Sequence, residues 1–153
     1  MHPQINMMRA TRTWLLNIIK DLSVEQLNEV PAGFNNNIIW NVGHLIAAQQ
    51  GVCYVRAGLK PVVEEKYFLN YKTDTKPGDP LGEEEINTIK QLLHSTLDQL
   101  ESDLDKNIFS NYTEWATRSG LEMKHIDDAL SFLPFHEGLH VGYVMALKRI
   151  ITG

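Results

Sequence analysis

Two histidines near the end of the chain, His136 and His140, stand four residues apart in the segment 135–140, FHEGLH. A helix advances about 100° per residue, so residues four apart lie about 40° from each other, one turn along the same face. Both imidazoles can therefore reach one metal ion. The segment also matches HExxH, the metalloprotease motif in which two histidines bind zinc and the glutamate acts as a base. The spacing alone does not choose between these two kinds of site.

The residues around the motif argue against a peptidase. A metzincin needs glycine at 143 and histidine at 146, and this chain has Tyr143 and Ala146. No carboxylate follows between Val141 and Gly153 to supply the third ligand of a thermolysin-like site. Glu137 is rotated about 100° from His136 on a helix. Three roles therefore stay open for it: a surface residue, a partner behind the ligands, or a catalytic base at the mouth of a pocket.

His44 is the candidate third ligand, because of the face that it occupies on a predicted helix over 38–57. The residues within about 60° of His44 on this helix are Trp40, Ala47, Ala48, Gly51 and Val55. Most of them are small, so a neighbouring helix can approach closely. Metal sites in helix bundles are commonly built in the core from facing helices. Three neutral imidazoles suit a divalent ion such as zinc or nickel and leave a coordination position open, as in catalytic sites. From the residues alone, histidines kept for packing remain an equal alternative for the pair on the last helix.

Helical periodicity recurs in four long stretches, and no stretch alternates as a half-buried strand would. The expected helices run from Pro3 to about Asp21, Ile38 to Ala57, Glu83 to Asp103, and Ile126 to Ile151. Ser23 and Gln26 form a capping-box pattern that predicts a short helical turn to about Asn28. The three asparagines 35–37 can cap the helix that begins near Ile38, and Gly58 is expected to end it. The predicted fold is all-α, a four-helix bundle with long crossover connections at 59–82 and 106–125. Pro134 predicts a kink or a loosened turn just before His136.

The connection at 59–82 is long for a small domain, which indicates that it covers something or has a role. We expect its aromatic stretch around 66–71 to pack across one end of the bundle as a partly ordered lid. On this hypothesis Tyr67, Phe68 and Tyr71 shape substrate choice and do not affect metal content.

Length and composition indicate one soluble domain over 1–153. Hydrophobic residues make up 43% and charged residues 22% of the 153, and the formal net charge is −5. Scattered basic residues in an acidic chain argue against nucleic-acid binding. No apolar run is long enough for a membrane helix, and the start lacks a signal peptide's pattern, so we expect a cytoplasmic protein. The single cysteine, Cys53, lies about 180° from His44 and is a poor candidate for ligand or nucleophile.

Two segments, 37–45 (NIIWNVGHL) and 135–143 (FHEGLHVGY), resemble the two histidine motifs of the DinB-like metalloprotein superfamily, which includes the YfiT-like proteins. The order of elements is similar along nearly the whole chain. The resemblance implies a four-helix bundle in which one histidine of the second helix and an HxxxH pair of the last helix bind a divalent metal. His44, His136 and His140 match those ligands, and Gly142 matches the small residue that follows the last one.

The resemblance further implies a metal-dependent transferase or hydrolase. Characterised relatives use a low-molecular-weight thiol such as bacillithiol, mycothiol or glutathione, which predicts an S-transferase or a related hydrolase with a small-molecule substrate. The alternative is a non-enzymatic protein that binds a metal or a small ligand, as a dimer. Family members often pair, so a homodimer is expected. Glu137 and Tyr143 are weak catalytic candidates, and Trp40 and Tyr143 are candidates for the substrate pocket; packing in the core is the favoured alternative for both aromatic residues.

Overall fold

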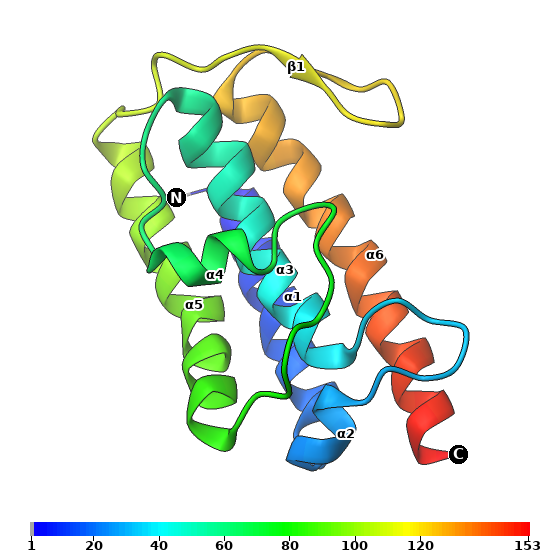
Figure 1. Cartoon of the computed structure of the whole chain (residues 1–153). Helices are drawn as coiled ribbons and strands as arrows, with labels where there is room; N and C mark the ends of the chain where they lie inside the picture. The colour runs from blue at the N-terminus through cyan, green and yellow to red at the C-terminus, as the bar shows by residue number, and fades with distance from the viewer. Residues whose placement is uncertain (1) are drawn as a thin grey trace.

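Four long helices lie side by side in the computed structural model, which describes residues 2–153 (Figure 1). They are α1 (Pro3–Ile19), α3 (Ile38–Gln49), α5 (Glu83–Asp105) and α6 (Ile126–Thr152). The all-α prediction is confirmed. Met1, which belongs to the predicted domain 1–153, lies outside the described residues.

The four helices form a ring in which α1 packs on α5 and α6, and α3 packs on the same two helices. Helices α1 and α6 run in one direction, and α3 and α5 run in the other (Figure 1). The connection between α3 and α5 therefore returns the chain along the length of the bundle. The connection between α5 and α6 stays at one end. Two helices, α3 and α6, thus face each other from parts of the sequence about ninety residues apart.

The caps at the starts of α2 and α3 are those that the sequence predicts. At α2 (Val24–Asn28), the Ser23 hydroxyl accepts from the Gln26 N–H at 3.1 Å, and the Gln26 side chain accepts from the Ser23 N–H at 2.9 Å. At α3, Asn37 Oδ1 accepts from the Trp40 N–H at 2.8 Å. Each cap satisfies backbone donors that have no partner inside the helix.

Beyond Gln49 the second long helix continues, as predicted, to Ala57. It first widens into a π-helical turn, η1 (Gln50–Tyr54), and then tightens into a 3-10 turn, η2 (Val55–Ala57). Gly58 ends it with φ of +74°, a left-handed conformation that only glycine adopts without cost.

Two connections differ from expectation. The short helix α4 (Glu65–Leu69) packs against the side of α3. The prediction that this stretch lies across one end of the bundle is therefore wrong. The second connection carries a small antiparallel hairpin of β1 (Trp115–Ala116) and β2 (Glu122–Met123), which periodicity over two residues could not reveal. Helix α6 stays helical through Pro134, so the predicted loosened turn is absent from this stretch.

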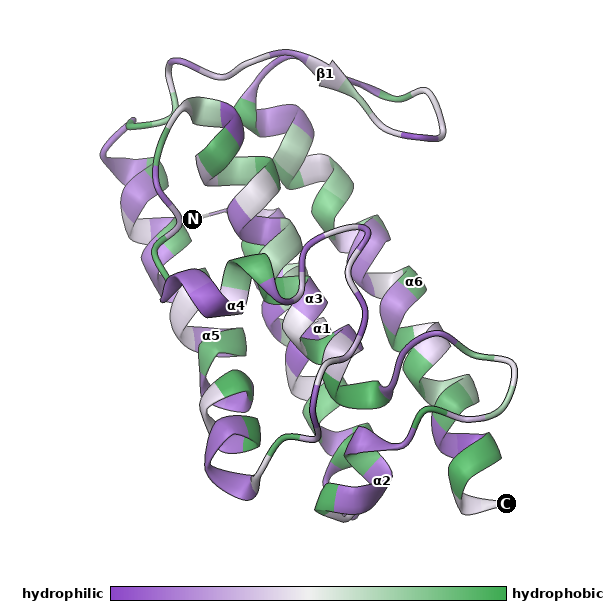
Figure 2. Cartoon of the chain, in the orientation of Figure 1, coloured by the Kyte–Doolittle hydropathy of each residue, from purple (hydrophilic) through white to green (hydrophobic). Residues whose placement is uncertain are grey.

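Apolar residues recur along each long helix and meet between them (Figure 2). The described residues form two apolar clusters, one around Ile38, Leu45 and Val144 and the other around Cys53 and Leu97. Cys53 is fully buried, and burial raises the pKa of its thiol to about 12. None of the helices among residues 2–153 is both long and apolar enough to cross a membrane.

A buried guanidinium joins all four long helices. Arg12 of α1 is 0% exposed, and its Nε and Nη2 both donate to Glu137 Oε1 of α6, at 2.9 and 2.6 Å. Nη2 also donates to Gln49 Oε1 of α3 at 3.0 Å. Nη1 donates to the Leu93 carbonyl and to Thr96 Oγ1 of α5, at 2.6 and 3.1 Å. These bonds match the five N–H donors of arginine, so the buried charge is fully solvated by the protein.

Glu137 is therefore a core residue, and the surface role that the sequence left open for it is wrong: the residue is 0% exposed. Burial raises the pKa of Glu137, and the Arg12 guanidinium opposes that shift. The carboxylate Oε2 is buried without a hydrogen-bond partner. We take the side chain as ionised at neutral pH, because Arg12 beside it is a permanent cation.

Replacement of Glu137 by alanine should lower the free energy of unfolding of the metal-free protein by about 3–5 kcal/mol, because Arg12 keeps a buried charge with no counter-ion. Urea denaturation followed by circular dichroism measures this change. Asp98→Ala is the control, because it removes only an exposed partner of Arg9 and should cost less than about 1 kcal/mol. Equal losses in the two variants would contradict the role given to the Arg12–Glu137 pair.

Candidate metal centre

The structure brings together the three histidines that the sequence singled out. His44 comes from the middle of α3, and His136 and His140 come from successive turns of α6. Their ring centroids are 4.6 to 5.2 Å apart, and one nitrogen of each lies within 4.8 Å of the others. Tetrahedral Zn–N bonds of about 2.0–2.1 Å place nitrogens about 3.4 Å apart, so small ring rotations close the site around an ion. The donor set fits a divalent metal.

The tautomer of His44 is fixed by a backbone carbonyl. His44 is 5% exposed, and its Nδ1 lies 2.7 Å from the carbonyl oxygen of Tyr71. A carbonyl oxygen only accepts, so Nδ1 carries the proton and donates it. The Nε2 lone pair is then left for a metal, and the hydrogen bond also orients the ring, as acceptors behind metal-binding histidines commonly do.

The tautomer of His140 is fixed by a side-chain amide. Asn41 Oδ1 lies 2.8 Å from His140 Nδ1. The orientation of this amide follows from its other end, because Nδ2 donates to two oxygens, the Asn37 carbonyl at 2.8 Å and Asn36 Oδ1 at 3.0 Å. A flipped amide would set oxygen against oxygen. His140 Nδ1 therefore donates, and its Nε2 is free to coordinate.

His136 is different, because its buried Nδ1 has no hydrogen-bond partner among the described residues. A buried ring nitrogen without a partner is uncommon in folded proteins and costs free energy. An ion coordinated at this nitrogen would give it the partner that the protein does not supply. Phe132, one turn earlier on α6, packs beside it with ring centroids 5.7 Å apart.

All three imidazoles are held neutral. Burial and, to a smaller extent, the neighbouring imidazoles lower the pKa of His136 to about 4 and that of His140 to about 3. Burial also lowers the pKa of His44, against the opposing effect of the Tyr71 hydrogen bond. No carboxylate, ammonium or guanidinium group contributes to these shifts. At pH 7 each imidazole can thus offer a lone pair in a site with no charge of its own.

A close contact between two elements places the Tyr71 carbonyl. The ring of Tyr71 lies directly on Gly43 of α3, where an added Cβ would meet the ring at 2.5 Å. Only glycine leaves this space, and it precedes His44 in the chain. The segment after α4 therefore packs against α3 closely enough for its backbone to bond a candidate ligand.

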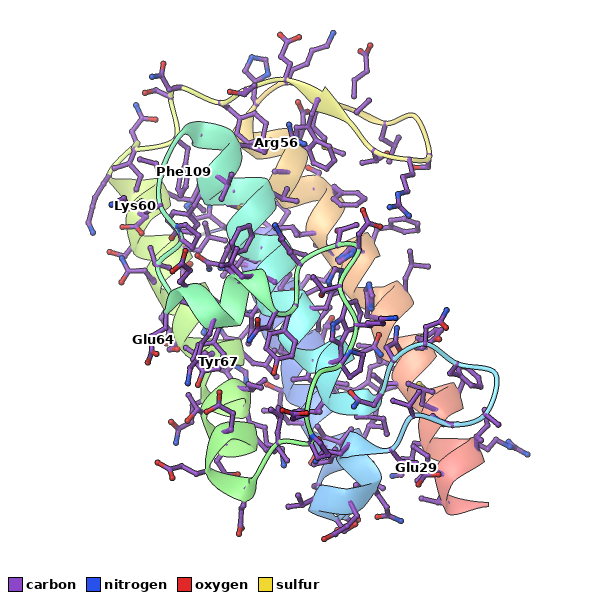
Figure 3. All side chains as sticks on the ribbon, viewed as in Figure 1. Glu29, Arg56, Lys60, Glu64, Tyr67 and Phe109 are labelled. Atoms are coloured by element: carbon purple, nitrogen blue, oxygen red, sulfur yellow. The ribbon has the colours of Figure 1, made fainter. Side chains whose placement is uncertain are left out.

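The aromatic residues of the predicted lid point inward. Tyr67 and Tyr71 are 4% and 8% exposed, and Figure 3 shows Tyr67 between α4 and α5. Phe68 packs on Gly51. These positions leave little surface for a substrate, and the Tyr71 carbonyl acts on His44. The hypothesis that these residues set substrate choice independently of the metal therefore does not fit the structure.

The remaining candidates fall on different sides of the site. The carboxylate of Glu137 is directed to Arg12 in the core. Tyr143 is 37% exposed and meets the edge of Phe34 at 5.8 Å, so the prediction of a core tyrosine is wrong.

Trp40 is 7% exposed and stacks on His44 at 4.8 Å with an interplanar angle of 11°, as the favoured packing role predicts. It also borders a pocket of about 420 Å³ whose lining includes none of the three histidines.

The two groups that orient the ligands, Asn41 and the Tyr71 carbonyl, were not predicted from the sequence. Asn41 stands one turn before His44 on the same helix, and its side chain accepts from His140. A search of the helical projection for acceptors near the candidate ligands would find it. The Tyr71 carbonyl has no signal in the sequence, because every residue carries a backbone carbonyl.

Gly43→Ala should weaken metal binding by about 10- to 100-fold, since Tyr71 must move away from α3 and its hydrogen bond to His44 is lost. Competition with a chromophoric chelator measures the affinity. Gly51→Ala is the matched control on the same helix, because its Cβ would meet Phe68 at an ordinary 3.5 Å and the metal affinity should stay within about twofold. A similar affinity in both variants would show that Tyr71 does not position His44.

The metal-free protein should lose stability as the pH falls from about 6.5 toward 4. In this window the histidines of the unfolded chain bind protons, and the buried His136 and His140 do not, so stability rises with pH. Thermal unfolding between pH 4 and 7 measures the slope, which should be smaller in His140→Gln. An unchanged slope in His140→Gln would contradict the buried neutral imidazole.

Comparison with known proteins agrees with this geometry. A search of curated proteins found no significant match. Residues 7–144, most of the chain, match the family described as the DinB superfamily. The match spans α1 through the turns of α6 that carry His136 and His140. The chain belongs to the DinB superfamily.

Proposed function

We propose that this protein is a divalent-metal-dependent enzyme that binds its ion through His44, His136 and His140 and acts on a small molecule. The observation that carries the proposal is a cluster of three neutral imidazoles to which no fourth histidine, cysteine or carboxylate of residues 2–153 is added. Such a set leaves a coordination position for a ligand from solution, as catalytic sites do. Imidazole ligands suit zinc or nickel.

The reaction that we propose is thiol-dependent S-transfer or a related hydrolysis. When bound, a divalent ion lowers the pKa of a coordinated thiol, which favours the thiolate at neutral pH. The residues of the chain supply the rest: Tyr71 and Asn41 keep Nε2 of His44 and His140 unprotonated, and burial keeps all three imidazoles uncharged. An uncharged ligand set leaves the full charge of the ion to act on the bound group.

We assign no proton transfer to Glu137, because both of the hydrogen bonds that its carboxylate accepts come from the buried Arg12. In the proposed S-transfer a low-molecular-weight thiol would be the nucleophile. We also propose that the protein forms a homodimer. Light scattering on the purified protein tests this proposal, because the monomer mass is 17.5 kDa.

Elemental analysis of the wild type beside His136→Ala is the experiment that tests this function. The wild type should contain about one equivalent of a divalent metal, which His136→Ala loses. His94→Ala controls for the loss of a histidine from another helix, α5, and should keep the metal. The loaded wild type should then accelerate the reaction of a small thiol with an electrophile.

Absence of metal in the wild type, even after reconstitution with zinc and nickel, would overturn the metal site. A bound metal without any thiol-dependent turnover would instead favour a protein that only binds a metal or a small ligand.

A further inference from the structure

An apolar surface lies beside the histidines on the solvent side of α6. We define the apolar rim as the side chains of Phe34, Phe132, Phe135, Leu139 and Tyr143. Three of them are well exposed, with Phe135 and Leu139 at 58% and Tyr143 at 37%. Exposed apolar residues that cluster in this way commonly mark a place where another molecule binds.

Helical spacing places the rim next to the candidate ligands. Phe132 stands one turn before His136, and their ring centroids are 5.7 Å apart. Leu139 lies three residues after His136, and Tyr143 lies three residues after His140, so each neighbours an imidazole on the helix surface. In angular terms the rim occupies the sector of α6 just outside the histidines. A molecule that binds at the surface beside His136 and His140 would therefore contact these side chains.

The exposed surface of α6 around the rim carries no charged side chain. All exposed side chains of α6 between Ser131 and Lys148 are uncharged: Phe135, Gly138, Leu139, Gly142, Tyr143, Met145 and Ala146.

The guanidinium of Arg56 lies at the edge of this region, where β1 crosses the end of the bundle (Figure 3). It is 4.7 Å above the centre of the Trp115 ring, and Trp115 meets Phe132 edge-on at 6.4 Å. Two aromatic rings thus separate this charge from His136. The side chains of the rim are themselves uncharged, so they contribute contact with apolar groups.

We propose that the substrate bound at the open position presents an uncharged, apolar group to the rim, with Leu139 and Tyr143 as specificity-determining residues. This inference rests on the proposed metal-dependent function and adds the class of ligand to it. A carboxylate placed on the rim would lose water without gaining a partner, whereas an aromatic or aliphatic group would bury area with Leu139 and Tyr143.

Cobalt-loaded protein and two matched thiols test the proposal. Phenylmethanethiol and 4-(mercaptomethyl)benzoic acid have the same thiol on the same ring and differ in one carboxylate. Binding is followed by the sulfur-to-cobalt absorption band. The neutral thiol should bind at least about 10-fold more tightly to the wild type. Leu139→Lys should reduce this preference at least about fivefold, because the new ammonium group attracts the carboxylate.

Met145→Lys is the matched control, since Met145 is also exposed on α6 but is rotated about 120° from Leu139, and its replacement should leave the preference unchanged. Equal affinities of the wild type for the two thiols, with cobalt bound, would overturn the apolar ligand class alone. Failure to bind cobalt would overturn the proposed metal function. Bound cobalt without a sulfur band for either thiol would overturn the thiol chemistry and the ligand class together.

Light scattering on the same samples separates a small-molecule site from a protein interface. The mass of Leu139→Lys should equal that of the wild type. A shift from dimer to monomer in this variant alone would show that a second copy of the chain covers the rim, and would overturn its assignment to a substrate.

Discussion

The structure depends on one buried guanidinium. A bundle core is apolar, and a charge within it is tolerated only when every donor finds an acceptor and a counter-ion is close. Arg12 meets both conditions by bonding to α3, α5 and α6 at once. Because a guanidinium is planar and rigid, these bonds fix how the helices are rotated as well as how closely they pack. Glu137 follows His136 directly in the chain, so the pair that compensates the charge also sets the direction in which α6 presents its histidines.

Two buried polar systems therefore lie on different faces of the same stretch of α6, and they follow opposite electrostatic rules. Around Glu137 a negative charge is retained and matched by Arg12. Around His136 and His140 the side chains are stripped of water, which lowers their pKa values and keeps them neutral. A site without charge of its own suits a metal ion, which brings the positive charge. This difference explains why Glu137, although it is next to His136 in the chain, takes no part in the histidine cluster.

The sequence predicted those features that depend on local spacing. Ser23 predicted the start of the short helix α2, and Asn37 and Gly58 predicted the two ends of the second long helix. The pairing of His136 with His140 followed from helical geometry. Features that depend on distant contacts were not predictable in this way. Glu137 bonds to a residue 125 positions away, and the exposure of Tyr143 depends on how α6 rotates to serve that bond. The Tyr71 carbonyl is equally remote from the residue that it holds.

The burial of Cys53 has a consequence for resistance to oxidation. The one thiol of the chain is 0% exposed, and its raised pKa leaves almost no thiolate at neutral pH. Thiolates, and not thiols, react with oxidants and disulfides. A protein proposed to work with a free thiol from solution thus keeps its own sulfur out of disulfide exchange with that cosubstrate. Shifts in the redox state of the surrounding thiol pool would change the supply of the cosubstrate and leave the covalent state of this cysteine unaltered.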